Sequence, residues 1–403
     1  MMVANSIQIG LRWLVAVMLM LATSTAFAQV PDQSRDPDEK LASLDKPIEA
    51  FVSLGQSNNV GHLLAEPGLE LEACIGNRSI ARTDGPSWLS YHGTSGPGHG
   101  KHIILISAEQ EYRSEQSMPM LAKILATHHG FDCTVLFGVN EKGEVDPTMP
   151  VYPKKGEEAN FKEHSIPGLE KLQSADLVIF YTRLLTLPKE QQALIVKYLD
   201  SGKPIIGLRT ANHGFRGALP YKIDGKQVRF GDNVLGGEFR GHHGNWHRDS
   251  TRGEIVESMK SHPVLRGVND IWGPSDVYRT FAEGGELPAG CQALVFGQPL
   301  IGREYGGDAN PKKEPLPIAW IKNWQTSGGL SARVFHSTMA SGKDLENPGL
   351  RRLIVNASYW CIGLEDKISD ASSVELVDAY APLVSGFNYE KLGVFPKMAK
   401  EYK

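Results

Sequence analysis

Clusters of charged and polar side chains follow several apolar runs of the chain, and their types suit acid–base chemistry on an oxygen-rich ligand. A histidine can accept and return a proton near neutral pH, because its ordinary pKa is about 6.5. Arginine and carboxylate groups can bind hydroxyls or stabilise a negative charge that develops during a reaction. The clusters contain Glu111, Arg113, Arg183, Arg209, Thr210, His213, His242, His243, His247, Asp276, Tyr278 and His336. We interpret these residues as the candidate site.

Three histidines in the segment GHHGNWHRDSTRG raise the question of a divalent metal ion. Neutral imidazoles are common ligands of zinc and related ions, so His242, His243 and His247 could bind one. Their spacing is not the i, i+4 arrangement of a zincin helix, and adjacent histidines cannot both point the same way from a strand. Metal binding and hydrogen bonding to a sugar therefore both stay open for this segment. No other cofactor is predicted.

The apolar runs in the first half of the chain alternate with amphipathic segments, and this alternation predicts the fold. Strands are expected at 102–108, 133–139, 176–182 and 203–210, and helices at 114–129, 166–175 and 188–202. Strands that alternate with helices at this spacing form a mainly parallel sheet through right-handed crossovers, with helices on both faces. The predicted fold class is therefore α/β, doubly wound. Catalytic groups are expected at the carboxyl ends of its strands.

The second half of the chain is less regular. Beyond residue 214 the pattern loosens up to about residue 253, and strand-like runs return at 292–300, 316–324 and 331–339. A final helix is expected at 348–363. Ser114 is interpreted as the N-cap of the helix at 114–129, and Pro188 as the start of the helix at 188–202. Residues 366–403 form a polar C-terminal tail with isolated aromatic residues, which we expect to pack across the surface.

The first 28 residues have the features of a secretory signal peptide. Arg12 precedes the apolar run 14–22, and an A-x-A cleavage site follows at 26–28. We therefore expect an exported protein, periplasmic or secreted, with no membrane span after cleavage; an uncleaved anchor is the alternative. Residues 29–100 are interpreted as a lead-in to the main domain.

Charge and cysteine content limit the partners further. The net charge of −4 gives no electrostatic reason to expect nucleic acid or an anionic membrane as partner, and small neutral ligands remain open. The four cysteines form no C-x-x-C pair, which argues against a zinc ribbon or a redox dithiol. Cys133 and Cys361 lie in apolar runs and are interpreted as buried small hydrophobic residues. The sequence determines neither a disulfide pairing nor the oligomeric state.

Several motifs together resemble the trehalose-utilisation (ThuA-like) family, in the exported form common in planctomycete-type bacteria. They include SADLVIFYTR, GKPIIGLRTANHGF, GHHGNWHRDSTRG and HPVLRGVNDIWGPSDVY, and the resemblance runs in order from residue 84 to about residue 390. It implies a ThuA-like domain at 101–365 with a variant of the class I glutamine amidotransferase sheet. That sheet agrees with the doubly wound, flavodoxin-like class expected from the alternation of elements.

The same resemblance excludes one activity. Class I amidotransferases carry a nucleophilic cysteine on the sharp turn after a strand of the type P-I-x-G-x-C, and here PIIGLR places Arg209 in that position. A guanidinium group cannot act as a nucleophile. The chain is therefore not expected to be a glutamine amidotransferase.

Ser57 in the segment FVSLGQSNNVGH offers another chemistry, because GQSN resembles the first motif of SGNH-type carbohydrate esterases. An esterase serine requires a histidine and an acid, and no D-x-x-H motif occurs near the C-terminus. The ThuA-like resemblance also begins so early that too little chain precedes it for an esterase domain. Ser57 is therefore interpreted as a lead-in residue, and a carbohydrate esterase is the weakest alternative.

The family resemblance implies sugar processing with a small carbohydrate ligand, in company with oxidoreductases that make 3-keto glycosides. A ketone at C3 acidifies the C2 proton, so that a base can start elimination, hydrolysis or isomerisation. In this hypothesis His213 is the base, Arg209 and Arg113 stabilise the enediolate, and His336 is a second acid or base. Glu111, Arg183, Thr210, His242, His243, Asp276 and Tyr278 would bind the substrate.

An alternative from another class is an exported carbohydrate-binding protein without turnover. The missing cysteine suits a degenerate amidotransferase scaffold of this kind. Four tryptophans would be available to stack on sugars, namely Trp246, Trp272, Trp320 and Trp324. A binding protein would take up intact sugars, whereas an enzyme would show histidine-dependent chemistry.

Overall fold

The computed structural model describes residues 81–82, 84–280 and 287–402, all within the unit Leu71–Lys403. The predicted signal peptide, most of the lead-in and Ser57 lie outside the described residues. Within them, no helix is both long enough and apolar enough to cross a membrane. The three described cysteines carry no disulfide, and Cys133 and Cys361 are buried, as predicted.

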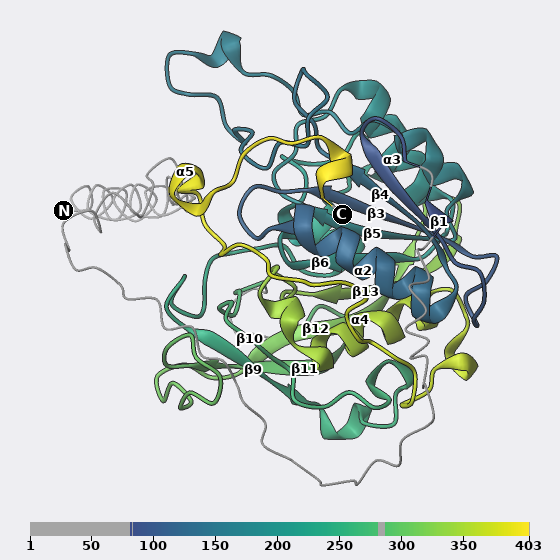
Figure 1. Ribbon diagram of the computed structural model, residues 1–403, viewed down its shortest axis with the longest axis vertical. Helices are drawn as coiled ribbons and strands as arrows, with labels where there is room; N and C mark the ends of the chain where they lie inside the picture. Colours follow the sequence, from purple (N-terminus) through teal and green to yellow (C-terminus); the bar gives the residue numbers. More distant parts are fainter. Residues whose placement is uncertain (1–80, 83, 281–286, 403) are drawn as a thin grey trace, which may run out of the picture. The chain divides into compact units, whose positions relative to one another are not determined.

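The fold is built on one large mixed sheet (Figure 1). Along the sheet its strands lie in the order β1-β2-β4-β3-β5-β6-β13-β12-β11-β9-β10. Their bounds are Ala81–Arg82 (β1), Trp88–His92 (β2), His102–Ala108 (β3), Asp132–Phe137 (β4), Leu177–Thr182 (β5), Ile205–Leu208 (β6), Ser250–Ile255 (β9), Trp272–Gly273 (β10), Cys291–Leu300 (β11), Leu316–Gln325 (β12) and Ser331–Ser337 (β13). A separate hairpin pairs Lys222–Ile223 (β7) with Lys226–Gln227 (β8).

The centre of the sheet is parallel. Strands β4, β3, β5, β6 and β13 all run in one direction, and in chain order they form the 2-1-3-4-5 arrangement of flavodoxin-like folds. The remaining strands of the sheet pair antiparallel on either side of this core. The doubly wound α/β prediction is confirmed for the core, and the complete sheet is mixed because hairpins extend it at both edges.

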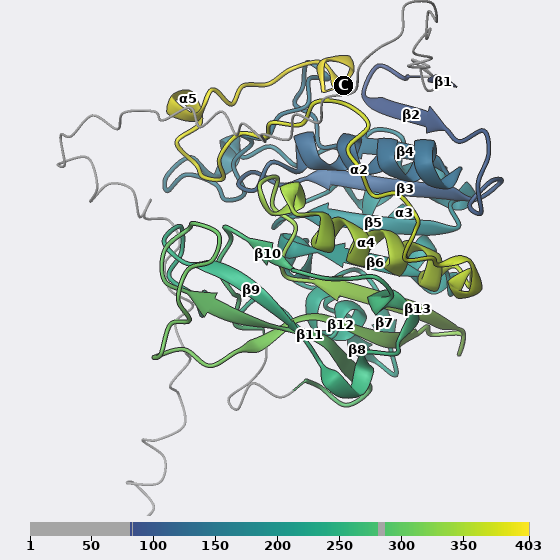
Figure 2. The same cartoon turned by 60° about the horizontal axis from the view of Figure 1, so that its bottom comes forward.

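Helices cover both faces of the parallel core (Figure 2). Helices α2 (Ser114–His129) and α4 (Pro348–Cys361) pack on one face, and α3 (Lys189–Asp200) with the 3₁₀ helix η3 (Leu169–Ser174) packs on the other. Alternate residues of a strand point to opposite faces, so Ile103 and Leu105 of β3 join the α2 side while Ile104 and Ile106 join the α3 side. Both faces are apolar for this reason.

The predicted helices occur where expected, with local corrections. The segment 166–175 forms only the 3₁₀ helix η3. Ser114 is the first residue of α2 rather than its N-cap, because the side chain of Glu109 accepts the amide hydrogen bonds of the preceding loop and of Ser114 itself. Gly130, at φ 80°, ends α2 as the sequence predicts.

The C-terminal segment runs over the α2 side of the sheet, where Figure 1 shows it in yellow. Lys123 of α2 pairs with Asp378, and the amide of Leu383 donates to the side-chain oxygen of Gln116 (2.9 Å). The short helix α5 (Tyr389–Leu392) follows, and Lys397 pairs through its backbone with Val145. The tail therefore lies against elements of the domain that are far from it in sequence.

Candidate functional site

The carboxyl ends of β3, β5 and β6 bring several of the predicted residues together. The strand order reverses between β3 and β5, and in open α/β sheets ligands bind outside the carboxyl ends of the strands at such a reversal. Glu111 follows β3, Arg183 follows β5, and Arg209 to His213 follow β6. The candidate site is built around these loops.

Glu111 is the buried acidic centre of the site. Its Oε1 accepts hydrogen bonds from Trp246 Nε1 (2.7 Å) and His247 Nε2 (3.2 Å), and its Oε2 lies 3.9 Å from Arg183 Nε. Burial alone would raise the pKa of this carboxyl, but the His247 hydrogen bond and the charge of Arg183 outweigh it and lower the pKa to about 2. Glu111 is therefore ionised and holds three side chains around it.

Arg209 occupies the turn between β6 and the 3₁₀ helix η4 (Arg209–His213). Its φ of 39° is left-handed, which is rare outside glycine. This strained backbone is expected of the sharp turn that follows the strand, which we call the elbow. Its guanidinium carbon lies 4.0 Å and 4.3 Å from the ring centroids of Tyr112 and Tyr278. Because Arg209 is fully buried, the elbow presents a cation enclosed between two rings and no nucleophile.

Asp276 connects this buried arginine to a histidine at the surface. Its Oδ1 accepts from Arg209 Nη2 (3.3 Å), and its Oδ2 accepts from His242 Nδ1 (2.7 Å). The segments that carry His242 and Tyr278 pair as an isolated antiparallel bridge, which fixes this geometry. The His242 side chain is 31% exposed, so its other ring nitrogen remains available to a ligand while Asp276 orients the ring.

His213 ends η4 beside the same surface. Its Nδ1 donates to Asn212 Oδ1 (2.8 Å), and its ring lies 4.7 Å from that of Phe239. Burial, reinforced by the charge of Arg183, holds the pKa of His213 well below its usual range. The imidazole is therefore neutral at ordinary pH, and its Nε2 carries a free lone pair.

Aromatic rings connect the polar groups into one continuous surface. Phe239 lies 5.2 Å from His242, which lies 5.9 Å from Trp246, and Trp246 lies 6.3 Å from Phe387. Phe387 in turn lies 5.0 Å from the guanidinium carbon of Arg183. Phe239 and Phe387 were not predicted, because nothing in the sequence marks an aromatic residue outside the strands as a neighbour of the histidines.

Two predicted cations have roles other than the expected one. Arg113 is fully buried and donates to the carbonyl oxygens of Gln110, Glu111 and Gly386, with distances of 2.8 to 3.2 Å. Arg209 donates to Asp276 and to the Thr338 carbonyl oxygen (2.7 Å). Direct contact of Arg113 or Arg209 with an enediolate does not fit these placements, because both guanidinium groups are enclosed by protein.

Other predicted residues lie away from this surface. His336 is fully buried within β13, where its Nδ1 donates to the Gly207 carbonyl oxygen (2.8 Å) and its ring lies 4.6 Å from that of Trp320. His243 is buried and its Nε2 donates to the Glu314 carbonyl oxygen (2.8 Å). Thr210 follows Arg209 in η4 and is fully buried. Their expected contact with substrate does not follow from these positions.

The histidine triplet does not form a joint ligand set. His242 bonds Asp276, His243 bonds a backbone carbonyl, and His247 bonds Glu111. Among the described residues, no three His, Cys, Asp or Glu side chains are arranged to hold a metal ion. These donors therefore do not fit the divalent ion considered for this segment.

The tryptophans differ in their availability for sugar stacking. Trp320 and Trp324 are buried in the core and donate to the carbonyl oxygens of Leu235 and Leu199, so their predicted availability is wrong. Trp272 is half-buried in β10. Trp246 is the one of the four that joins the candidate site, where it bonds Glu111.

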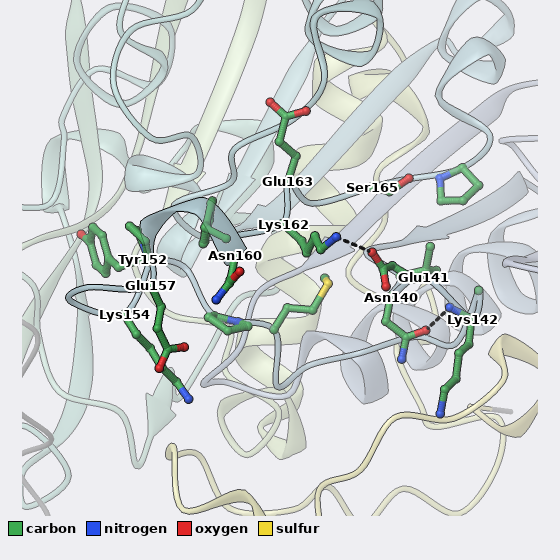
Figure 3. Close-up of a pocket in the computed structure, with 17 residues that line it drawn as sticks. Asn140, Glu141, Lys142, Tyr152, Lys154, Glu157, Asn160, Lys162, Glu163 and Ser165 are labelled. Carbon is green, nitrogen blue, oxygen red and sulfur yellow. Dashed lines mark hydrogen bonds and ion pairs between the residues drawn. The ribbon is translucent and has the colours of Figure 1, made fainter.

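A cavity of about 740 Å³ lies in the connection between β4 and β5 (Figure 3). Tyr152, Phe161 and Met149 supply apolar walls, and Lys154 and Glu163 are among its charged residues. None of the predicted site residues lines it. Because its lining contains none of the histidines and arginines that gather at the strand ends, we place the candidate site at the histidine surface instead.

Several solved structures are similar to this chain. Two similar solved structures are ThuA-like proteins from Bacteroides uniformis ATCC 8492 (17% identity, 66% of this chain and 93% of that chain, TM-score 0.39) and Parabacteroides merdae ATCC 43184 (15%, 75% and 99%, 0.38). A catalytic mutant of a GH42 β-galactosidase from G. stearothermophilus is also similar (9%, 68% and 31%, 0.33). No curated protein shows significant similarity.

The family match covers the whole parallel core. Residues 104–361, more than half of the chain, match the ThuA family, described as trehalose utilisation. This segment begins in β3 and ends with α4, so it contains the loops that carry Glu111, Arg183, His213 and His242. The chain therefore belongs to the ThuA trehalose-utilisation family.

Proposed function

We propose that the chain is an exported sugar-processing enzyme that removes a proton next to the carbonyl of a keto-sugar or keto-glycoside. In a 3-keto glycoside the C2 proton is acidic, because the electrons of the broken C–H bond can move onto the ketone oxygen. Such a reaction needs a neutral base, a cation near the developing negative oxygen and, for elimination, a proton for the leaving oxygen. The site offers a candidate for each need.

His213 is the proposed base. Its lowered pKa keeps the ring neutral at ordinary pH, and Asn212 fixes Nδ1 as the donor. The lone pair of Nε2 is then free to take the C2 proton. A low pKa makes the histidine a weaker base, but it also ensures that nearly all molecules carry the reactive form.

Arg183 is the proposed partner of the enediolate oxygen. It is the cation that remains partly exposed, at 12% of its side chain, whereas Arg113 and Arg209 are enclosed. Glu111 and the ring of Phe387 hold its guanidinium in place. A positioned donor of this type stabilises charge that appears only in the transition state.

His242 is the proposed proton donor to the oxygen that leaves C1. Asp276 orients its ring through the hydrogen bond to Nδ1. During elimination, the C2–H bond breaks toward His213, a C1=C2 double bond forms, and the C1–O bond breaks. The leaving oxygen then takes the proton from His242. This assignment replaces His336 as the second acid or base.

The observation that carries the proposal is the convergence of His213, Asp276-bound His242 and Arg183 at the strand reversal. The test is a proton NMR time course of the mature protein with a 3-keto disaccharide in deuterated water. We expect the C2 proton signal to disappear faster than in buffer, and His242→Ala to retain C2 exchange while losing release of the second sugar. The proposal would be contradicted if the wild-type protein neither accelerated the loss of the C2 proton signal nor released the second sugar.

A carbohydrate-binding protein without turnover is the second candidate. The continuous ring contacts of Phe239, His242, Trp246 and Phe387 favour it, because sugar rings stack their apolar C–H faces on aromatic side chains. Of these four, His242 is exposed and the others are half-buried. The same NMR sample distinguishes the two candidates. Broadening or shift of sugar signals without any change in the C2 proton would support binding alone.

A further inference from the structure

The C-terminal tail, outside the segment that matches the family, contributes a side chain to the candidate site. The family match ends at residue 361, and the tail reaches the β3–α2 loop at Gly386. The amide of Gly386 donates to the Glu111 carbonyl oxygen (2.9 Å), and its carbonyl oxygen accepts from Arg113 Nη2 (2.8 Å). The fully buried Arg113 therefore fixes the tail beside Glu111.

Gly386 itself is suited to this close approach. Its φ of 144° lies in a region that favours glycine, and an added Cβ would lie 3.3 Å from Leu392 Cδ1 and 3.4 Å from His247 Cε1. The tail backbone thus packs directly against the histidine that bonds Glu111. This contact determines where the next residue, Phe387, can place its ring.

Phe387 meets two site residues. Its ring centroid lies 5.0 Å from the guanidinium carbon of Arg183 and 6.3 Å from the Trp246 ring, with ring planes tilted by 32°. Both neighbours also contact the Glu111 carboxylate. The Phe387 ring is half-buried, so part of it stays open at the surface.

The two ends of the aromatic surface differ in chemistry. His213 and His242 flank Phe239 at one end, whereas Trp246 and Phe387 form the other end. Among the described residues, the ring contacts of Phe387 are with Trp246, Tyr389 and Arg183, and none is with a histidine ring. The reacting sugar ring belongs beside the histidines, and the other end is free to receive the rest of the substrate.

We propose that Phe387 and Trp246 form a specificity wall against which the second sugar ring of a disaccharide substrate stacks. This inference rests on the proposed function, since it places that second ring relative to the proposed base. Stacking on an aromatic ring is worth roughly tenfold in affinity. The tail of this chain would therefore select disaccharides over simple glycosides at a site whose chemistry lies in the family domain.

The test compares two substrates with the full mature chain: the 3-keto derivative of trehalose and the 3-keto derivative of a methyl glucoside. For Phe387→Ala we expect KM to rise about tenfold for the disaccharide and less than about twofold for the methyl glycoside. Any loss of kcat from a less firmly held Arg183 should be equal for the two substrates. Phe387→Tyr keeps the ring and should retain the wild-type KM. Phe395→Ala is the matched control, because Phe395 lies in the same tail and is 51% exposed.

Phe387→Leu separates stacking from folding. It keeps an apolar side chain that can support the tail, so the protein should fold, while the disaccharide preference is lost. Equal KM changes for both substrates in Phe387→Ala and Phe387→Leu would overturn the wall and leave the proposed function intact. Wild-type protein that turns over neither substrate would overturn the proposed function, and this inference with it.

Discussion

His213 and His336 are associated with neighbouring parallel strands, but their surroundings differ. His213 follows β6, and His336 lies in β13 directly opposite Gly207 of β6. Burial lowers the pKa of both, to about 3 for His336. His213 lies beside Phe239 and near His242 and Arg183, whereas His336 bonds a backbone carbonyl and packs on Trp320 in the core.

The difference shows that a lowered pKa does not by itself identify a catalytic histidine. Desolvation penalises the imidazolium in a core as strongly as in a site. His213 differs from His336 in its neighbouring side chains, which are a second histidine, the ionised Glu111 and the partly exposed Arg183. Position after a strand, where a loop turns the side chain out of the sheet, decides which of the two can meet a ligand.

The largest expected effect is on the rate of C2 proton exchange, which substitution of His213 should lower far more than substitution of His336. We expect His213→Ala to lower the rate of C2 proton exchange by a factor of roughly 100 or more, the usual contribution of a general base. His336→Gln should change the rate by less than about fivefold, because His336 has no contact with the site surface. Single-turnover exchange by NMR measures both. A comparable loss in the two variants would break the comparison.

The second prediction concerns the pH dependence of stability. The folded-state pKa of His336, about 3, lies below its unfolded value, so the unfolded chain takes up the proton first as the pH falls. The stabilisation is complete above about pH 6.5 and is lost progressively toward pH 3, by about 2 kcal/mol at pH 5. His336→Gln should therefore lose less stability than the wild type between pH 7 and pH 5.

Urea unfolding at the two pH values measures this difference. The variant will be less stable than the wild type at pH 7, since it loses a fitted ring beside Trp320. Only the change with pH tests the prediction. An equal slope in both proteins would show that His336 titrates normally in the folded chain.

The smallest expected effect is an absence of change. If His213 is the base, the rate of C2 exchange should not fall as the pH passes through the usual histidine pKa of about 6.5, because burial and Arg183 hold the pKa of His213 well below its usual range. The rate should fall only at lower pH. Arg183→Gln removes one cause of that low pKa and should move the fall to higher pH, which stopped-flow exchange measurements can detect.

Most of the parallel core could be predicted from the sequence, because each of its strands and helices is marked by a local pattern of apolar residues. The run 102–108 corresponds to β3, 114–129 to α2 and 348–363 to α4 within two residues. Each is a continuous apolar or amphipathic segment with a terminator such as Gly130. Strand β9 was missed because residues such as Arg252 and Glu254 interrupt its apolar pattern near the edge of the sheet.

The candidate site was predicted in its residue types and only partly in its geometry. The sequence by itself determined that Glu111, Arg183, Arg209 and His213 follow strands and so gather at one edge of the sheet, and that Arg209 replaces a nucleophile. That follows because strand ends are fixed by local periodicity and parallel strands end at the same edge.

Only the tertiary structure decided which of these groups faces a ligand. Arg113 and Arg209 are enclosed, His336 turns into the core, and Asp276 orients His242. The tail brings Phe387 to Arg183 from far along the chain. The physical reason is that burial and pairing of charged groups depend on contacts between segments distant in sequence, and no local pattern encodes those contacts.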